Sequence, residues 1–200
     1  DSVGNLHLLY AKPVPGEDRC EIVYATGPSP TNLVKTVLET NGSLASISAG
    51  ILVNKTNDVV HVCYHKDSPA YLVHQTIDAG IPSEQQQVDG RGWHSKMQLD
   101  SNGNALFVRE SVNSLRLFIP NDASPTWFGI NFSPSGSHAY RIADFVYDRT
   151  RGRLHVTYGD NASTFKGSPM HNLHYAFSDN STDWEHSVVD SSTTLWELEF

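Results

Sequence analysis

Short stretches of alternating apolar and polar residues recur along the chain. The clearest runs from Arg153 to Tyr158, where leucine, valine and tyrosine alternate with arginine, histidine and threonine. A period of two predicts a β-strand with one buried face. Three more segments share this character, at Leu6–Tyr10, Val60–Tyr64 and Leu106–Arg109.

Each of these strands is followed by a second short apolar and aromatic run. Copies of the pair recur roughly every 47 residues, a repeat length typical of β-propeller blades. No window of adequate length shows a helical apolar period. The sequence therefore predicts an all-β propeller of one domain, with repeats at roughly 5–57, 58–104, 105–152 and 153–200. The second runs are Glu21–Ala25, Tyr71–His74, Leu115–Phe118 and Leu173–Ala176.

The last repeat predicts the strand plan of one blade. We expect an inner strand at His138–Tyr147, a second strand at Arg153–Tyr158 and a third at Leu173–Phe177. The third is followed by a tight turn and an outer strand at Glu185–Asp190. The segments Gly80–Gly92 and Gly159–Asn172 are expected to be long loops.

Each end of the chain lacks a strand that the other end could supply. The first blade lacks an inner strand, and Thr193–Phe200 has the pattern of an inner strand with nothing after it. Pairing them would remove two exposed strand edges. We therefore expect four blades of four antiparallel strands, with the C-terminal strand closing the ring. The alternative is a piece of a larger ring.

Alternating strand direction gathers two classes of loop on one face of such a ring. This face is aromatic and charged, whereas the other carries Asp, Asn and Gly turns of structural character. We expect a ligand to bind on the aromatic face, and the alternative for each aromatic residue is packing between blades. The candidate ligand-binding residues are Tyr64, His65, Trp93, His94, Arg109, His138, Tyr140, Tyr158 and Asp160.

Composition excludes several classes of function. The formal net charge is −8, and no cluster of Lys and Arg could replace the counterions of a nucleic acid. No apolar stretch is long enough to span a bilayer, and no dinucleotide or phosphate-loop motif occurs, so no cofactor is expected. Ten histidines invite a metal interpretation, most densely at His61-x-Cys63-x-His65. We favour packing, because His7, His61 and His155 occupy one repeat position, and expect no metal.

Two weak features favour an extracellular location. Asn-x-Ser/Thr acceptors for glycosylation occur at Asn41, Asn54, Asn161 and Asn180, with a fifth at Asn131 followed by Phe-Ser-Pro. Cys20 and Cys63 are expected to form one disulfide, the alternative being two buried thiols. The chain starts at Asp1, which would suit a processed terminus.

The segment Ser178-Asp-Asn-Ser-Thr-Asp-Trp184 resembles the Asp-box turn of bacterial neuraminidase repeats, with the acid one place early and Thr182 in place of glycine. The run from His138 to Asp179 also resembles repeats of secreted propellers that act on polysaccharides. The lyases among these imply a catalytic set of His65, Arg109 and Tyr140. The match breaks at Gly159, where that family would place arginine.

These observations predict a secreted, lectin-like propeller that binds a glycan or polysaccharide. One alternative is a lyase-like enzyme acting on uronate-containing glycans, and another is a non-catalytic protein-interaction propeller. The sequence does not predict an oligomeric state.

Overall fold

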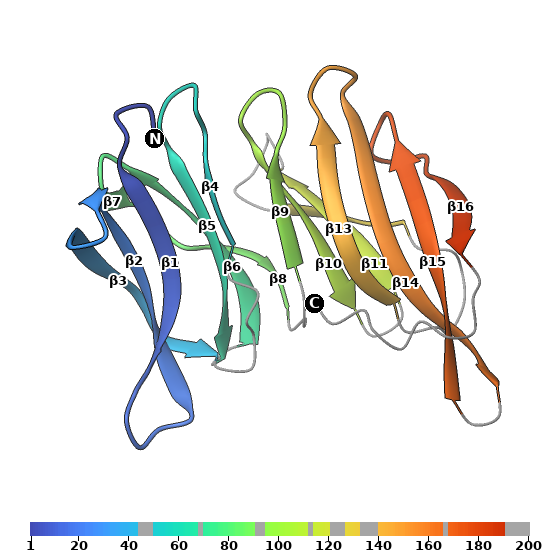
Figure 1. The fold of residues 1–200 in the computed structure, drawn as a ribbon, viewed down its shortest axis with the longest axis horizontal. Coiled ribbons are helices and arrows are strands. Elements are labelled where there is room, and N and C mark those ends of the chain that lie inside the picture. The colour runs from blue at the N-terminus through green and yellow to red at the C-terminus, as the bar shows by residue number, and fades with distance from the viewer. Residues whose placement is uncertain are drawn as a thin grey trace. The chain divides into compact units, whose positions relative to one another are not determined.

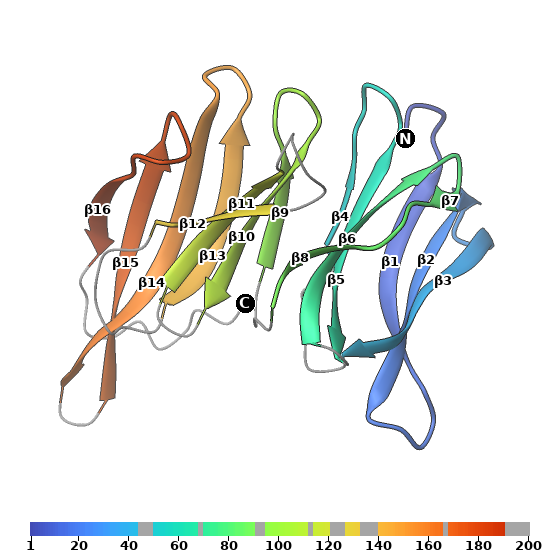
Figure 2. The ribbon, with the colours of Figure 1, turned by 180° about the vertical axis from the view of Figure 1, so that it is seen from behind.

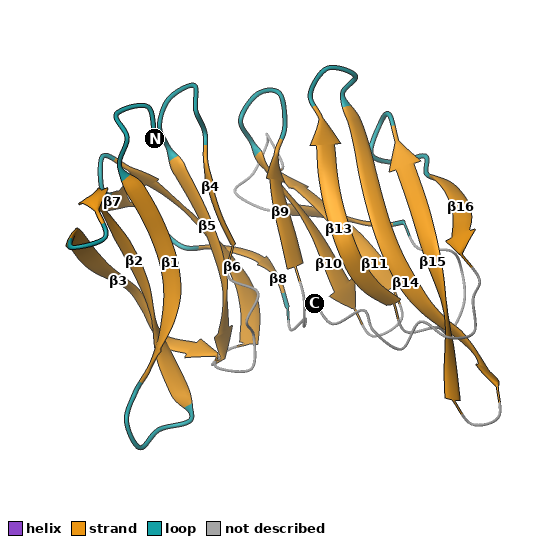
Figure 3. Ribbon diagram, in the orientation of Figure 1, coloured by secondary structure: helices purple, strands orange, loops and turns teal. Residues whose placement is uncertain are grey.

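A computed structural model describes residues 1–43, 50–67, 70–90, 95–111, 114–120, 127–132, 140–165 and 168–190. These residues form strands β1–β16 and loops, and none of them is helical (Figure 3). The described part of the chain therefore offers no helix that could cross a membrane. The chain divides into two compact units, Asp1–Gly92 with Asn121–Trp127, and Trp93–Pro120 with Phe128–Phe200.

The first unit contains two groups of strands. In the first strand group, β1 (Leu6–Pro13), β2 (Arg19–Ser29) and β3 (Asn32–Ser43) pair in antiparallel order (Figure 1). The second strand group contains β4 (Gly50–Val53), β5 (Val60–Asp67), β6 (Ala70–Asp78), β7 (Ile81–Pro82) and β8 (Gln86–Asp89). Both β7 and β8 pair with β6, as Figure 2 shows from behind.

A single residue pair, Gly42 opposite Lys66, links the two groups through β3 and β5. Glycine is required there by close packing, because a Cβ at Gly42 would lie 2.7 Å from the Ile22 side chain and 2.9 Å from Cys20 Sγ.

The second unit contains two four-stranded sheets. The third strand group has the order β12 (Trp127–Asn131), β11 (Ser114–Pro120), β10 (Ala105–Ser111) and β9 (Ser95–Leu99). The fourth strand group has the order β13 (Tyr140–Asp148), β14 (Arg153–Phe165), β15 (Ser168–Ser178) and β16 (Glu185–Asp190). Both sheets are consecutive antiparallel meanders, as the strand plan of a blade predicts.

Each unit has its own core, formed where the face of one strand group packs on the next. In the first unit, Ile22 and Tyr24 of β2 contact the β5 face that carries Val60, Val62 and Tyr64. In the second unit, the contacting residues are Leu106, Val108, Leu115 and Leu117 of the third group, and Leu154, Val156 and Tyr158 of the fourth. These faces come from the apolar positions of the predicted alternating strands.

Two predicted loops are corrected by the structure. Gly80–Gly92 contains β7 and β8. Most of Gly159–Asn172 is strand, because β14 continues to Phe165 and β15 already begins at Ser168. A register shift between Asp160 and Ser163 lets the ribbon continue. The residues of these strand segments are mostly polar and pair through their backbones. Because they do not alternate between apolar and polar positions, the sequence did not reveal them as strands.

The first strand group has three strands, and within the described residues β1 pairs only with β2. The inner strand that the sequence predicted to be missing is therefore absent there. None of the sheets is closed within the described residues. The expected closing segment, Thr193–Phe200, lies outside the described residues.

Candidate functional site

The predicted ligand-binding residues are largely buried where the structure describes them. Tyr64 and Tyr158 have 0% exposed surface, His65 has 5% and Arg109 has 4%. Tyr140 and Asp160 lie opposite each other in the β13–β14 ladder, and only their backbones are described. Trp93, His94 and His138 lie outside the described residues.

The two tyrosines are integrated into their sheets. The Tyr64 hydroxyl donates to Gln75 Oε1 at 2.6 Å, and burial raises the pKa of Tyr64 well above its usual value. The Tyr158 ring stacks on His174 with centroids 4.9 Å apart. Both rings thus pack within the fold and present no face to solvent. Their role in ligand binding stays a prediction, and it would require these rings to become exposed.

The histidines of the repeated strand position do occupy one structural slot. His7 Nδ1 shares a 2.6 Å hydrogen bond with the Tyr24 hydroxyl, and His155 Nδ1 shares a bond of the same length with the Tyr175 hydroxyl. His61 instead stacks on a second histidine, with 3.2 Å between its Nδ1 and Nε2 of the neighbouring ring. The partner always lies diagonally on the next strand, so each of these histidines makes its side-chain contact within its own strand group, and its packing between blades stays a prediction.

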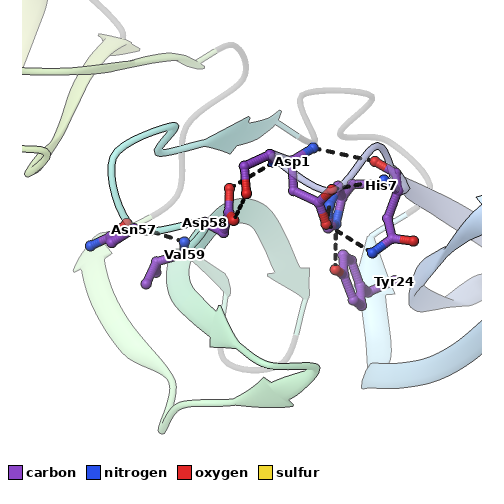
Figure 4. Close-up of polar contacts among 8 residues, drawn as sticks. Asp1, His7, Tyr24, Asn57, Asp58 and Val59 are labelled. Atoms are coloured by element: carbon purple, nitrogen blue, oxygen red, sulfur yellow. Dashed lines mark hydrogen bonds and ion pairs between the residues drawn. The ribbon is translucent and has the colours of Figure 1, made fainter.

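The His7 pair continues into a polar clasp at the start of the chain (Figure 4). His7 Nε2 lies 3.0 Å from Asp1 Oδ2. Asp58, in the turn before β5, accepts hydrogen bonds from the backbone and hydroxyl of Ser2. Burial lowers the pKa of His7, so the imidazole is neutral near pH 7. These contacts join the first strand group to the second, so we assign the polar clasp a structural role.

A second buried polar cluster surrounds Glu39 on β3. Its carboxylate accepts hydrogen bonds from Lys66 Nζ at 2.7 Å and Gln85 Nε2 at 3.1 Å. The backbone N–H groups of Thr40 and Asn41 supply two more, at 2.9 and 2.8 Å. Burial by itself raises the pKa of Glu39, but these hydrogen bonds outweigh it and the pKa is lowered. A carboxylate held ionised by four donors is structural.

Accessible polar and aromatic side chains lie together at the turn between β15 and β16. A pocket of about 180 Å³ opens there, lined by Phe177, Ser178, Asp179, Asn180, Asp183, Trp184 and Glu185. This volume is below the roughly 300–1,000 Å³ of drug-sized sites. The pocket therefore suits a small ligand or one terminal unit of a chain.

The turn that forms this pocket is tightly organised. Asn180 Oδ1 accepts hydrogen bonds from the backbone N–H groups of Thr182 at 3.0 Å and Asp183 at 2.8 Å. Trp184 Nε1 donates to the carbonyl of Ser181 at 3.1 Å, and its ring stacks on Phe132 with centroids 4.3 Å apart. The asparagine thus performs the capping that the resemblance assigned to an aspartate.

Arg153 orders one wall of the pocket. Its Nε and Nη2 donate to the two carboxylate oxygens of Asp179, at 2.6 and 2.8 Å. Its guanidinium lies over the Phe177 ring, 4.4 Å from the centroid. The hydrogen bonds from Arg153 lower the pKa of Asp179, which is therefore a fixed, ionised acceptor at the pocket rim. The sequence predicted a purely structural role for this turn. The aromatic and acidic residues that lie within eight positions there could have indicated a binding site.

No metal site emerges from the part of the chain that the structure describes: no group of three or more His, Cys, Asp or Glu side chains there is placed to hold an ion. His61, Cys63 and His65 do share one side of β5, as their spacing predicts. The pKa of the adjacent His74 is lowered to about 4, first by burial. Burial also lowers the pKa of His61 and raises that of Cys63, so these two side chains and His74 are neutral at physiological pH.

The predicted disulfide is wrong. Cys20 and Cys63 are 0% and 1% exposed and are not bonded to each other. Cys20 packs in the core on the side of β5 that carries Val62 and Tyr64. Alternation along the strand turns Cys63 to the opposite side. Both cysteines behave as small apolar residues, and burial raises the pKa of the Cys63 thiol to about 12.

The predicted glycosylation sites differ in accessibility. Asn180 is exposed, although its side chain organises the turn, and Asn41 is half-buried beside Arg19. Asn54 is 6% exposed, and its side-chain oxygen accepts a hydrogen bond from the Thr56 N–H. The Asn161 side chain lies outside the described residues.

Comparison with known proteins finds similarity in structure alone. No known family and no curated protein matches the sequence, so the Asp-box resemblance has no support beyond one turn. Among solved structures, the chain resembles a GH43 β-1,3-galactosidase with a TM-score of 0.50 and 10% identity, covering 92% of this chain and 43% of that one. GH43 domains are five-bladed propellers.

Two further solved structures align at lower scores. One is a GH43 α-L-arabinofuranosidase from Clostridium thermocellum, with a TM-score of 0.45, 12% identity and coverage of 93% and 69% of the two chains. The other is an N-acetylgalactosamine deacetylase from F. plautii in complex with blood group B trisaccharide, with a TM-score of 0.49, 11% identity and coverage of 92% and 67%.

The chain therefore has a propeller-like β fold. It spans less than half the length of the galactosidase, and at 10% identity the likeness concerns the fold alone.

Proposed function

We propose that this chain is a carbohydrate-binding propeller domain and that it binds a sugar unit in the pocket at Ser178–Glu185. The observation that carries the proposal is the pocket itself, where aromatic rings and ionised or amide side chains converge in a volume of about 180 Å³. The fold shared with a galactosidase supports a glycan as the ligand class.

The chemistry of the pocket suits a neutral sugar. Phe177 and Trp184 are half-buried and line the pocket with apolar ring atoms that a pyranose can contact. Asp179, Asp183 and Glu185 are exposed carboxylates that accept hydrogen bonds from hydroxyl groups. The same acidic rim disfavours a uronate or sialic acid by like-charge repulsion.

Binding is favoured over catalysis by the state of Asp179. Arg153 holds this carboxylate ionised, whereas a general acid working near neutral pH needs a raised pKa. The alternative lyase set of His65, Arg109 and Tyr140 has its two described side chains buried, at 5% and 4% exposure. We keep that enzyme as the alternative, with an acidic polysaccharide as its substrate.

A glycan array followed by calorimetric titration tests this site. Asp183→Ala removes an acceptor from the rim, and we expect affinity for a neutral sugar to fall about tenfold or more, the worth of one hydrogen bond to a charged group. Asp18→Ala, an exposed acid of the β1–β2 hairpin, is the matched control and should bind as the parent.

Two results would point elsewhere. Affinity that survives Asp183→Ala but is lost in Trp93→Ala would move the site to the loop face predicted from the sequence. Growth of unsaturated-uronate absorbance on an acidic polysaccharide would establish the lyase.

We also propose that the domain works outside the cell, on the strength of the glycosylation acceptors at Asn41, Asn161 and Asn180. Expression through a secretory pathway, with and without a glycan-removing enzyme, tests this by the change in mass.

A further inference from the structure

The turn between β13 and β14 carries three arginines within five positions. Arg149, Arg151 and Arg153 are three of the eight arginines in a chain whose formal net charge is −8. Arg149 and Arg151 are exposed, and Arg153 is half-buried at the first position of β14. We call residues 148–153 the arginine turn. The sugar pocket uses Arg153 alone, so Arg149 and Arg151 have no role in the function proposed for it.

The fold of the arginine turn does not depend on the arginine side chains. Asp148 Oδ1 accepts hydrogen bonds from the backbone N–H groups of Thr150 at 2.9 Å and Arg151 at 3.3 Å. Gly152 supplies the positive φ, +67°, with which the hairpin closes. Asp148 and the backbone therefore hold the turn, and the exposed guanidinium groups are presented on a fixed backbone.

Two of the three guanidinium groups keep donors that an anion can use. Arg153 is neutralised by Asp179, which accepts hydrogen bonds from both its Nε and its Nη2. Arg151 is paired only loosely, because its Nε lies 4.0 Å from Asp148 Oδ2 and its side chain is 71% exposed. Within the described part of the chain, Arg149 makes no ion pair. The arginine turn therefore presents the charges of Arg149 and Arg151 to solvent.

The arginine turn is contiguous with the sugar pocket. Figure 1 shows the β13–β14 and β15–β16 turns at the same end of the fourth strand group. Asp148 lies opposite Arg153 in the β13–β14 ladder, and Arg153 is bonded to Asp179, which follows β15 and lines the pocket. These three residues form one row across the sheet. The row spans two strand spacings, about 10 Å, so a ligand of two or more sugar units can reach from the pocket to the arginine turn.

We propose that the ligand is an acidic oligosaccharide, in which a neutral unit occupies the pocket and the sulfate or carboxylate group of a neighbouring unit binds Arg149 and Arg151. This inference rests on the function proposed for the pocket and adds the chemical class of its ligand. Guanidinium groups bind oxyanions through paired N–H donors, which makes arginine more selective than lysine for such groups. The acidic rim at Asp183 and Glu185 repels an anion, so the two subsites together fix the orientation of the ligand.

Binding of dextran sulfate, compared with neutral dextran of the same backbone, tests the arginine turn. The double variant Arg149→Gln/Arg151→Gln removes both charges while Asp148 still holds the turn. In calorimetric titration, we expect the parent to bind dextran sulfate and the variant to bind it at least about tenfold more weakly, since charge-assisted hydrogen bonds are lost. Added salt should reduce this difference, because exposed charges are screened.

The matched control is the double variant Lys35→Gln/Lys55→Gln, which removes the same charge from two exposed residues of the first unit. It should bind dextran sulfate as the parent does. Polygalacturonate, titrated in the same way, distinguishes a carboxylate from a sulfate, because the polymer that loses more affinity in the arginine variant carries the group that is bound.

Three results would overturn the proposal. The parent could bind neither polyanion, or the two double variants could lose affinity equally, which would show attraction by overall charge. Tighter binding of a thymidine oligonucleotide than of either polysaccharide would assign the arginine turn to nucleic acid. The pocket is tested separately, by Asp183→Ala with a neutral sugar. A loss confined to the arginine variant would therefore refute the pocket alone, and a loss confined to Asp183→Ala would refute the arginine turn alone.

Discussion

The ion pair between Glu39 and Lys66 gives the sharpest test of how the first unit is held together. It links β3 to β5, two strands that share a single ladder position at Gly42 and Lys66. The side chains are 5% and 18% exposed, and the N–O distance is 2.7 Å. Lys66→Met keeps the aliphatic stem and removes the ammonium group, so the packing is preserved and the carboxylate loses its counter-charge.

The expected loss of stability follows from the surroundings of Glu39. Removing one partner of a buried pair costs about 3–5 kcal/mol. Glu39 retains Gln85 and two backbone donors, and the lysine is partly solvated, so we expect about 2 kcal/mol. Lys12→Met is the matched control, because Lys12 pairs with Glu21 at 2.8 Å but is 61% exposed. Little change is expected there.

The pH dependence of the variant has a definite sign. In the parent, the pKa of Glu39 is lowered, so its contribution to stability is present above the unfolded pKa and is lost as the pH falls through the folded pKa. In Lys66→Met the hydrogen bond and charge of the lysine no longer lower the pKa of Glu39, so this pKa rises relative to the parent. The stability difference between parent and variant should therefore be largest near neutral pH and shrink as the pH falls towards about 4.

Urea denaturation followed by circular dichroism, at about pH 7 and about pH 4.5, measures these differences. A double-mutant cycle with Glu39→Gln isolates the coupling between the two side chains. The reasoning fails if Lys66→Met costs no more than Lys12→Met at neutral pH. It also fails if the loss grows as the pH is lowered.

Four further outcomes are expected. Tyr175→Phe removes the hydroxyl bonded to the β14 histidine and should cost about 0.5–1.5 kcal/mol in urea denaturation, with unchanged secondary structure. Trp184→Ala removes a ring stacked in the core and should cost about 3 kcal/mol; a loss below half of that would mean the turn does not depend on it. Thiol titration should find Cys20 and Cys63 unreactive in the native protein and both reactive in unreduced, unfolded protein. In a secretory host, Asn54→Gln should leave the glycan mass unchanged, because the asparagine is buried; a lighter product would show that the folded acceptor is accessible.

The hairpins with local turn signals were predictable from the sequence. β9 and β10 flank Asp100–Gly103, where Asp100 accepts hydrogen bonds from the N–H groups of Asn102 and Asn104 and Gly103 has a φ of +86°. β13 and β14 flank a similar turn with Gly152 at a φ of +67°. Short-range chemistry sets such turns, so the residues that form them are visible in the chain.

Strand alternation also predicted which residues lie on the same side of a sheet. The shared strand position of His7, His61 and His155 was predictable from the sequence, since strand alternation assigns each residue to a side. Strand alternation alone could not exclude a disulfide between Cys20 and Cys63. Excluding it also requires knowing on which side of β2 the Cys20 side chain lies. That side depends on which face of β2 meets β5, a choice made by packing between groups.

The sequence could not predict which side chains of equivalent strand positions are exposed to solvent. Tyr10, Tyr64 and Tyr158 have one pattern and one repeat position, yet the latter two are fully buried and the first is half-buried. The sequence determined the strands, their alternation and the repeat, because these depend on neighbours a few residues apart. Only the tertiary structure decided which faces are covered and that a pocket opens at the β15–β16 turn, because coverage depends on the packing of sheets far apart in the chain.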